Sequence, residues 1–535
     1  MSDMAIRNAL IEAGLWPAAG GEPGGLPEPG GDLLSTVWRA WTQCGVSSDA
    51  SARRATAARA ESLRQAWQAG ARLTWNIPDV ALSRTTAWLG CRLAWWPGGI
   101  PQGRRVGLVS SRLGQELDRH KSWFAVLRTA CMRLDPQHDV LVTAGQTAAQ
   151  RFVQRCGRLF GLPVLSIQAQ RDGTAVWRDW GRRVLASLQE LPAAPDRVLL
   201  SPPLSADGRA DSLDELAGLP APDRAIFALC EHVVALHVRP EGNVMRLLQA
   251  RLRLPGFPTA SVFLALGPDL VGREQAAQLL DAGGVGWLVM NAAGEPEHDQ
   301  PVPWRAAASS QRHAAPIVPC PPSQPWPYLT HCTRRRSGPW PGENEDKFLD
   351  DLILDRPGAD HSALAALWRI TRSGRLMAGS DFVRGRTPVV SLTAVPLSEI
   401  GRLRTYRSHL GRWDFEPYGI CIRRDWLERR GTRPVRYGDE ALWKSLAAAE
   451  RPFFQKSDSH TASGKLIDWT VEREWRHVGD LTLDGIPADA ALLFVASEAE
   501  ARQLASSSPW PIVVLSAFGT GLPTGRDSSG LERRP

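Results

Sequence analysis

Short apolar runs alternate with longer segments of helical spacing through the first half of the chain. The apolar runs occupy residues 106–110, 140–144, 163–167, 197–201, 232–238, 261–267 and 285–290. The helix-like segments occupy 113–134, 146–160, 176–188, 221–230, 244–254 and 273–282. Uniformly apolar strands joined by helices are typical of a parallel sheet that is covered on both faces. The pattern therefore predicts an α/β domain with a doubly wound, mostly parallel sheet over residues 104–292.

The segment before this domain has a different character. Residues 17–32 are rich in glycine and proline, which predicts a flexible N-terminal segment over 1–32. Residues 33–103 contain helix-spaced apolar positions and an Ala/Arg/Glu-rich stretch at 50–70, which predicts a short helical preface to the sheet.

The alternation stops after residue 292. Six prolines fall within residues 316–327, and this density indicates an extended linker over 293–327. Strand-like and helix-like segments of mixed order follow, which predicts a second, α+β domain with a mixed sheet over 328–518 and a tail over 519–535. Within it, a helix over 362–373 is expected to end at Gly374 through a glycine C-cap.

Composition narrows the class of protein without selecting a function. Apolar residues make up 43% and charged residues 22% of the 535 residues, as in a soluble globular protein. The net charge of +7 permits anionic partners but does not single them out. The eight cysteines form no CxxC pair, so we expect free thiols, a cytoplasmic location and no metal site. No apolar run is long enough to predict a membrane span, and the oligomeric state stays open.

Polar turns follow several of the predicted parallel strands. Ser111 and Arg112 come after the first strand, Thr143 and Gly145 close the second, and Gly242 follows the fifth. Ligands of doubly wound sheets bind at the carboxyl ends of the strands, where small residues and helix N-termini suit a phosphate. Arg112 would add a bidentate donor. The turns therefore predict nucleotide binding, with ordinary loop residues as the alternative.

The same region distantly resembles the SLOG superfamily of Rossmann-like nucleotide-sensing domains, which is related to the DprA and LOG proteins. The resemblance covers about 104–255 and lies in RVGLVSSR, in the VLVTAG turn and in DRAIFALCEHVVALHVRPEGN. It implies a Rossmann-like fold and a nucleotide ligand. The second turn of that family usually holds two or more glycines, whereas this chain has only Gly145 there.

A dense cluster of charged and aromatic residues is DWTVEREWRHVGD, at 468–480. Residues 471–476 alternate in a way that predicts a strand with Glu472 and Glu474 on one face. Such an arrangement can aim a carboxylate into a cleft. The alternative is an edge strand whose charges pair with each other in solvent.

The second half of the chain resembles the AbiGi family of abortive-infection proteins from prokaryotic phage defence. The resemblance spans about 328–515 and rests on SHLGRWDFEPYGICIRRDWLERRGTRPVRYGDE followed by EREWR. It implies an antiphage setting in which a nucleotide-sensing domain is coupled to an effector domain.

Three motifs in this half look like the H-Y-E layout of ADP-ribosyltransferases, including the DarT-type toxins. They are a T-H-x-T strand with His331, an aromatic-glycine strand with Tyr418, and a late strand with Glu474. The resemblance implies that His331 binds a ribose hydroxyl of NAD, that Tyr418 stacks on nicotinamide, and that Glu474 stabilises the oxocarbenium charge. Three further residues, Thr333, Arg407 and Arg412, are expected to bind the cofactor. The two arginines would hold its pyrophosphate.

Two functions remain open from the sequence. One is an effector that transfers ADP-ribose to a protein or nucleic-acid target or that cleaves NAD. The other is a non-catalytic nucleotide-binding regulator or antitoxin-like partner, which would use Ser111, Arg112, Thr143 and Gly145.

Overall fold

The computed structural model describes residues 2–18, 25–29, 31–44, 49–75, 77, 80, 82–98, 102–114, 116–169, 176–189, 197–204, 214–216, 218–267, 270–288, 314–380, 383–407, 412–460 and 466–515. The chain divides into two compact units. Unit 1 comprises Met1–Glu297 together with Asp346–Arg356, and unit 2 comprises His298–Glu345 together with Pro357–Pro535.

Unit 1 is built on a sheet of nine strands among its described residues, in the order β1-β2-β6-β5-β4-β3-β7-β8-β9. Strands β3 to β9 run parallel, which confirms the predicted α/β fold. The strands are β1 (Arg72–Trp75), β2 (Arg92–Trp96), β3 (Arg104–Ser110), β4 (Asp139–Ala144), β5 (Val164–Ala169), β6 (Arg197–Pro203), β7 (His232–His237), β8 (Val262–Leu266) and β9 (Val285–Leu288).

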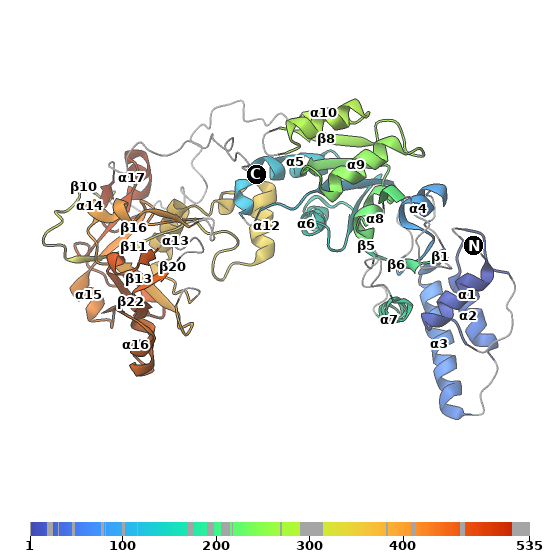
Figure 1. The fold of residues 1–535 in the computed structure, drawn as a ribbon, viewed down its shortest axis with the longest axis horizontal. Helices are drawn as coiled ribbons and strands as arrows, with labels where there is room; N and C mark the ends of the chain where they lie inside the picture. Colours follow the sequence, from blue (N-terminus) through green and yellow to red (C-terminus); the bar gives the residue numbers. More distant parts are fainter. Residues whose placement is uncertain are drawn as a thin grey trace. The chain divides into compact units, whose positions relative to one another are not determined.

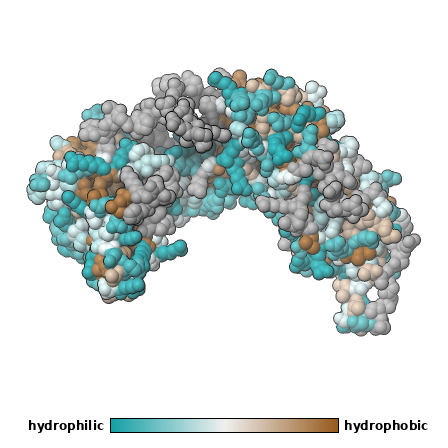
Figure 2. All heavy atoms as spheres, in the orientation of Figure 1, coloured by the Kyte–Doolittle hydropathy of each residue, from teal (hydrophilic) through white to brown (hydrophobic). Residues whose placement is uncertain are grey.

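Helices connect these strands as the sequence pattern predicts (Figure 1). They are α5 (Lys121–Met132), α6 (Gln150–Phe160), α7 (Trp177–Ser187), α8 (Ala221–Leu229), α9 (Asn243–Arg253) and α10 (Arg273–Asp281). The side chains of β4 are all buried, because helices cover both faces of the sheet. In Figure 2, hydrophilic residues predominate on the visible surface of α9 and α10.

The strand order reverses between β3 and β7. From β3 the chain adds β4, β5 and β6 on one side, and it then returns to place β7 on the other side of β3. Such a reversal splays the two loops that leave the carboxyl ends of the strands, and ligands of doubly wound sheets bind there. The loops that follow β3 and β7 are therefore where a ligand is expected to bind.

The N-terminal region contains more than the predicted helical preface. Helices α1 (Asp3–Glu12), α2 (Leu34–Gln43), α3 (Ala50–Gln68) and α4 (Leu82–Leu89) are present, but β1 and β2 also extend the sheet. Strand β2 pairs antiparallel with both β1 and β6. All five residues of β2 are buried. Trp95 joins a core that includes Ile6 and Leu10 of α1, whereas Trp96 joins a second core that includes Trp88 of α4. Burial of these aromatic side chains favours a strand in a segment that otherwise has helical spacing.

Unit 2 contains a mixed sheet of eight strands among its described residues, in the order β10-β25-β24-β16-β11-β13-β22-β17. This confirms the predicted second domain with a mixed sheet. The strands are β10 (Ile317–Val318), β11 (Tyr328–Cys332), β13 (Val389–Thr393), β16 (Gly419–Arg423), β17 (Arg433–Pro434), β22 (Glu474–Val478), β24 (Ala491–Val495) and β25 (Ile512–Val514).

The remaining elements of unit 2 are short. Its helices include α13 (Ala363–Ser373), α14 (Leu397–Ile400), α15 (Arg424–Glu428), α16 (Glu440–Ser445) and α17 (Glu498–Ala505). Helix α13 confirms the predicted glycine C-cap, since Gly374 ends the helix at φ 61°. At its other end the side chain of Ser362 accepts from the Ala365 amide. Strand β10 lies within the proline-rich segment and pairs at the edge of the sheet with β25. The expected tail and residues 293–313 of the expected linker lie outside the described residues.

Helix α12 (Glu345–Leu354) belongs almost entirely to unit 1, although the segments on either side of it in the sequence belong to unit 2. Its buried residues include Phe348, Leu349, Leu352 and Ile353. Figure 1 shows this helix beside α6. The sequence pattern gives no indication of this exchange, because α12 has the ordinary amphipathic spacing of a surface helix.

The described part of the chain contains no membrane-spanning type of helix and no cluster of metal ligands. None of its helices is both long and apolar enough to cross a membrane. No three histidine, cysteine or acidic side chains of the described residues are grouped so that they could hold a metal ion.

Candidate functional site

The loops that follow β3 and β7 are bound to each other at the strand reversal. The Ser111 amide donates to the His237 carbonyl at 2.7 Å, and the Arg239 amide donates to Ser111 Oγ at 3.0 Å. The Arg239 guanidinium donates to the Arg112 carbonyl at 2.7 Å. Ser111 is only 8% exposed, so its hydroxyl braces the two loops. The backbone of Arg112 is thereby fixed at the carboxyl edge of the sheet.

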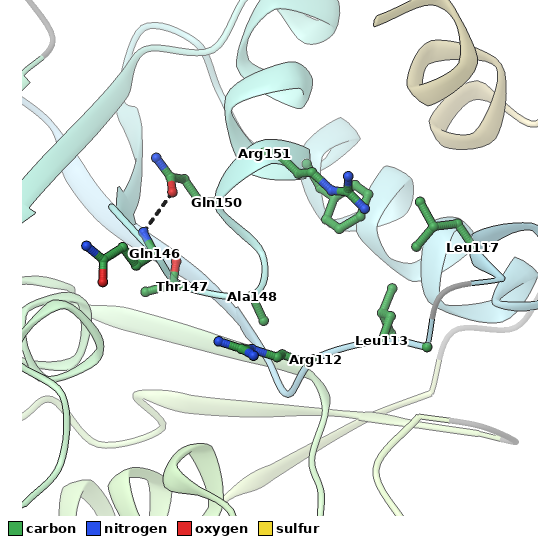
Figure 3. Close-up of a pocket in the computed structure, with 10 residues that line it drawn as sticks. Arg112, Leu113, Leu117, Gln146, Thr147, Ala148, Gln150 and Arg151 are labelled. Atoms are coloured by element: carbon green, nitrogen blue, oxygen red, sulfur yellow. Dashed lines mark hydrogen bonds between the residues drawn. The ribbon is translucent and has the colours of Figure 1, made fainter. Parts of the chain in front are cut away.

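A cavity of about 360 Å³ opens beside this fixed loop, at the carboxyl ends of β3 and β4 (Figure 3). The β3–α5 connection and the start of α6 supply its walls. The lining residues are Arg112, Leu113, Gly114, Leu117, Gln146, Thr147, Ala148, Gln150, Arg151 and Phe152. In Figure 3 the guanidinium of Arg112 extends toward the 146–148 loop.

The 146–148 loop has a defined internal structure. Gln146 adopts a left-handed backbone conformation at φ 70°, which is uncommon for a residue other than glycine. Its amide donates to Gln150 Oε1 at 2.9 Å, and Thr147 Oγ1 donates to the Ala144 carbonyl at 2.8 Å. Helix α6 consequently begins at Gln150, four residues later than the sequence pattern predicts. The first residues of α6, Gln150 to Phe152, line the cavity, so the positive end of the helix dipole lies beside it.

Three of the charged side chains at this edge are Arg112, Arg151 and Asp223. Arg112 and Arg151 line the cavity, and the Arg151 guanidinium lies 4.7 Å from the centroid of the Phe152 ring. Asp223, in the first turn of α8, is the third. Burial raises the pKa of Asp223 to about 6, and the charge of Arg112 partly opposes this rise. Arg112 and Arg151, the charged residues among those that line the cavity, are both basic.

Only Arg112 of the five residues predicted in unit 1 lines the cavity. Thr143 is 1% exposed inside β4, and the Gly145 amide is already bonded to the Ile167 carbonyl at 2.8 Å. Gly242 is the N-cap of α9, close to Ser111. These residues shape the edge of the sheet, and their direct contact with a phosphate stays a prediction.

Four polar lining residues are not among the predicted binding residues: Gln146, Thr147, Gln150 and Arg151. They lie within residues 146–151, a stretch of six residues after the second predicted strand, where the sequence pattern predicts a helix from residue 146. The dipeptide Gln150–Arg151 at the start of an amphipathic helix was the available signal.

In unit 2 the fold places His331 and Tyr418 on one face of neighbouring strands. His331 lies opposite Ile420 in the β11–β16 register, and Tyr418 precedes Ile420 by two residues. His331 Nδ1 donates to the Ser391 carbonyl at 2.9 Å, and burial lowers its pKa to about 4. The Tyr418 hydroxyl donates to Glu500 Oε1 at 2.9 Å, while burial and that carboxylate raise its pKa. Both side chains therefore have internal partners.

Glu474 lies on the opposite face of the same sheet. It pairs with Thr393 of β13, and Thr393 pairs with Thr330 of β11. Paired residues share a face and adjacent residues alternate, so Glu474 faces away from His331. The predicted assembly of His331, Tyr418 and Glu474 in one cleft is therefore wrong in its geometry.

The Glu474 carboxylate is bound by Arg476. Two hydrogen bonds of 2.9 Å join them, and their side chains are 13% and 3% exposed. Arg476 also donates to the carbonyls of Pro452 and Phe454. Such a buried bidentate pair stabilises the packing of its own surroundings.

The predicted continuous strand over 471–476 is also wrong. A single 3₁₀ turn covers Thr470–Glu472, Arg473 takes a left-handed conformation at φ 44°, and β22 begins only at Glu474. Glu472 therefore does not share a strand face with Glu474. The chain must turn here because Thr393 Oγ1 donates to the Glu472 carbonyl at 2.6 Å and the Ala394 amide donates to the Arg473 carbonyl at 3.1 Å.

The other residues predicted to hold NAD have defined places in unit 2. Thr333 is buried, and its hydroxyl donates to the carbonyls of Ala363 and Tyr418 at 2.7 and 3.1 Å. Arg407 and Arg412 pair with each other across the β14–β15 hairpin, which comprises Thr405–Arg407 and Arg412–Asp414. Their roles in NAD binding stay predictions.

Comparison with known proteins gives one distant likeness to a solved structure. No family model matches the sequence, and no curated protein matches it. Among solved structures, DNA processing protein A from Streptococcus pneumoniae matches at 15% identity with a TM-score of 0.26. The match covers 49% of this chain and 84% of that protein.

Proposed function

We propose that unit 1 is a receptor for a nucleotide, whose phosphates bind in the cavity beside Arg112. The observation that supports this best is the placement of Arg112 and Arg151 in one cavity with the N-terminus of α6, next to the strand reversal. Two guanidinium groups and a helix N-terminus attract the same kind of ligand group, an anion with several acceptor oxygens.

The remainder of the cavity suits the less polar parts of a nucleotide. Leu113, Leu117 and Phe152 provide apolar surface, and Gln146 and Thr147 provide hydrogen-bonding groups. Small-molecule sites typically combine such an apolar lining with a few polar groups, in cavities of about 300 to 1,000 Å³. A volume of about 360 Å³ suits a mononucleotide better than a full dinucleotide.

For the chain as a whole, we propose a role in antiphage defence in which nucleotide binding by unit 1 controls unit 2. The likeness of residues 328–515 to the AbiGi family supports this setting. Within it, the binding of Glu474 by Arg476 favours a non-catalytic regulator or antitoxin-like partner over an NAD-consuming enzyme. A catalytic carboxylate must be able to reach its substrate, and this one is bonded elsewhere.

Calorimetric titration of the full-length protein with ATP, NAD and inorganic pyrophosphate tests the receptor proposal. We expect ATP to bind, and we expect Arg112→Gln to weaken its binding about 10- to 150-fold, because a hydrogen bond to a charged group contributes about 1.5 to 3 kcal/mol. The matched control is Arg253→Gln, which removes the same charge from the last turn of α9, where Arg253 is 61% exposed.

The control variant should bind ATP as the wild type does. Absence of binding by all three compounds, or equal affinities of wild type and Arg112→Gln, would contradict the proposal. Preferential binding of NAD that is insensitive to Arg112→Gln would move the site to unit 2.

A further inference from the structure

Three arginines follow one another along a single face of α6. Arg151, Arg155 and Arg158 are spaced four and three residues apart, so they form one stripe on the helix surface. We call these three residues the α6 stripe. Arg151, at its N-terminal end, lines the cavity. The rise between Arg151 and Arg155 is about 6 Å, which is little more than one helical turn.

The other two arginines of the α6 stripe bind helix α12. The Arg155 guanidinium makes a bidentate ion pair with Asp350, and it lies 2.9 Å from Asp346. Arg158 lies 3.9 Å from Asp346. The side chains of Arg155 and Asp350 are 19% and 15% exposed, so water screens this pair only in part.

A second set of contacts fixes the C-terminal end of α12 to α5. Arg128 donates to the Ile353 carbonyl at 3.0 Å and lies 3.6 Å from the Asp355 carboxylate. Together the two sets make α12 an acidic helix on a basic surface. The chain continues from both ends of α12 into residues of unit 2.

We propose that a phosphorylated ligand in the cavity weakens the docking of α12 on the α6 stripe, so that α12 reports occupancy of unit 1 to the rest of the chain. This inference rests on the proposed function of the cavity. The argument is one of charge. A nucleotide brings several negative charges to Arg151, one helical turn from the arginine that already holds Asp350 and Asp346. Like charges that compete for one stripe of cations disfavour each other.

The apolar contacts of α12 limit the size of this effect. Phe348, Leu349, Leu352 and Ile353 are between 0 and 6% exposed, and the ligand does not touch them. Full release of the helix would require loss of their burial as well. The ligand should therefore shift the docking equilibrium about 10-fold, in the usual range of coupling between two sites, without dissociating the helix completely.

Hydrogen exchange measured by mass spectrometry tests the coupling in the full-length protein, with ATP as the probe. Amides of residues 346–354 should exchange about 10-fold faster with saturating ATP than without it. Adenosine at the same concentration supplies the base and ribose without phosphates, and it should leave the exchange of α12 unchanged.

A charge-neutralising variant tests the reverse direction of the same coupling. Asp346→Asn combined with Asp350→Asn weakens the docking of α12, because it removes the carboxylates that bind Arg155 and Arg158. Coupling between two sites is reciprocal, so the double variant should bind ATP about 5- to 10-fold more tightly. The matched control is Glu274→Gln combined with Asp281→Asn, which removes the same net charge from exposed positions of α10. Exchange of the β3 and β4 amides shows whether each variant keeps the folded sheet.

The outcomes separate the two proposals. Unchanged α12 exchange and equal ATP affinities in wild type and the double variant would overturn the coupling and leave the receptor intact. Slower exchange of α12 with ATP would overturn it as well, because the sign would be opposite. Failure of ATP to bind either protein would overturn the receptor proposal and the coupling together.

Discussion

Two carboxylate–arginine pairs in this protein have opposite characters. In unit 2, Glu474 and Arg476 share two hydrogen bonds of 2.9 Å and are almost completely buried. In unit 1, Arg112 acts on Asp223 through its charge, and no hydrogen bond between the two is recorded among the described residues. In the first pair, each side chain is the hydrogen-bonding partner of the other. In the second pair, the arginine lines an open cavity, and the pKa of the carboxyl group is raised to about 6.

The difference shows why local charge density is a poor guide to a ligand site. The stretch 468–480 is rich in charged residues, yet its central carboxylate, Glu474, is bound by Arg476, two residues further along the strand. Arg112 stands in an unremarkable turn. It gains importance from the strand reversal, which no local pattern encodes.

The largest effect that distinguishes the pairs is expected at Glu474. Glu474→Gln leaves the buried Arg476 without a counter-charge, and breaking a buried pair in this way costs about 3 to 5 kcal/mol. Urea denaturation of the full-length protein should show this loss in the transition of unit 2. The control, Glu498→Gln, breaks an exposed pair with Arg502 and should change the free energy of unfolding by less than about 0.5 kcal/mol. Equal stability of Glu474→Gln and wild type would show that Glu474 is not committed to Arg476.

A smaller effect, with the opposite sign, is expected at Asp223. The folded protein holds this proton more tightly than the unfolded chain, since the pKa rises from an ordinary 3.8 to about 6. The contribution of Asp223 to stability is therefore present in full below pH 4 and is lost as the pH rises through about 6. Asp223→Asn should remove this decline and make unit 1 more stable at pH 7, by up to about 3 kcal/mol.

Denaturation of wild type and Asp223→Asn at pH 4, 5, 6 and 7 measures the difference. The two curves should converge at low pH and separate as the pH rises. A variant that is less stable than wild type at pH 7 would show that the Asp223 carboxylate is a satisfied partner of Arg112 after all, like Glu474 with Arg476.

The smallest effect concerns Thr143, which the sequence places among the ligand-binding residues. Its side chain is 1% exposed inside β4 and does not line the cavity. Thr143→Val preserves the volume of the side chain, so ATP affinity should stay within about two-fold of wild type in a calorimetric titration. A ten-fold loss of affinity would instead indicate that this hydroxyl contacts a phosphate, as the sequence predicts.

The fold of unit 1 could be predicted from the sequence, because apolar runs and helical spacing indicate which residues are buried. Each of the seven predicted strands is present, including β4 with its wholly buried residues. Strands β1 and β2 were missed because they lie in a segment with helical spacing and pair antiparallel at the edge of the sheet. Such pairing depends on residues distant in the sequence.

The candidate site was accessible only in part. Arg112 was predicted from its position after an apolar strand, and it does line the cavity. Arg151 was not, because its role depends on where α6 begins, and this is fixed by the hydrogen bond between the Gln146 amide and Gln150. The position of Glu474 also required the structure, because a single left-handed residue, Arg473, ends the alternation on which its predicted face depended.

A crystal structure of the full-length protein grown with ATP tests the central claim most directly. We predict that the phosphates lie within hydrogen-bonding distance of the Arg112 guanidinium and the first amides of α6, with Glu474 still paired to Arg476. Density for the nucleotide in unit 2, beside His331 and Tyr418, with the cavity of unit 1 left empty, would contradict the account.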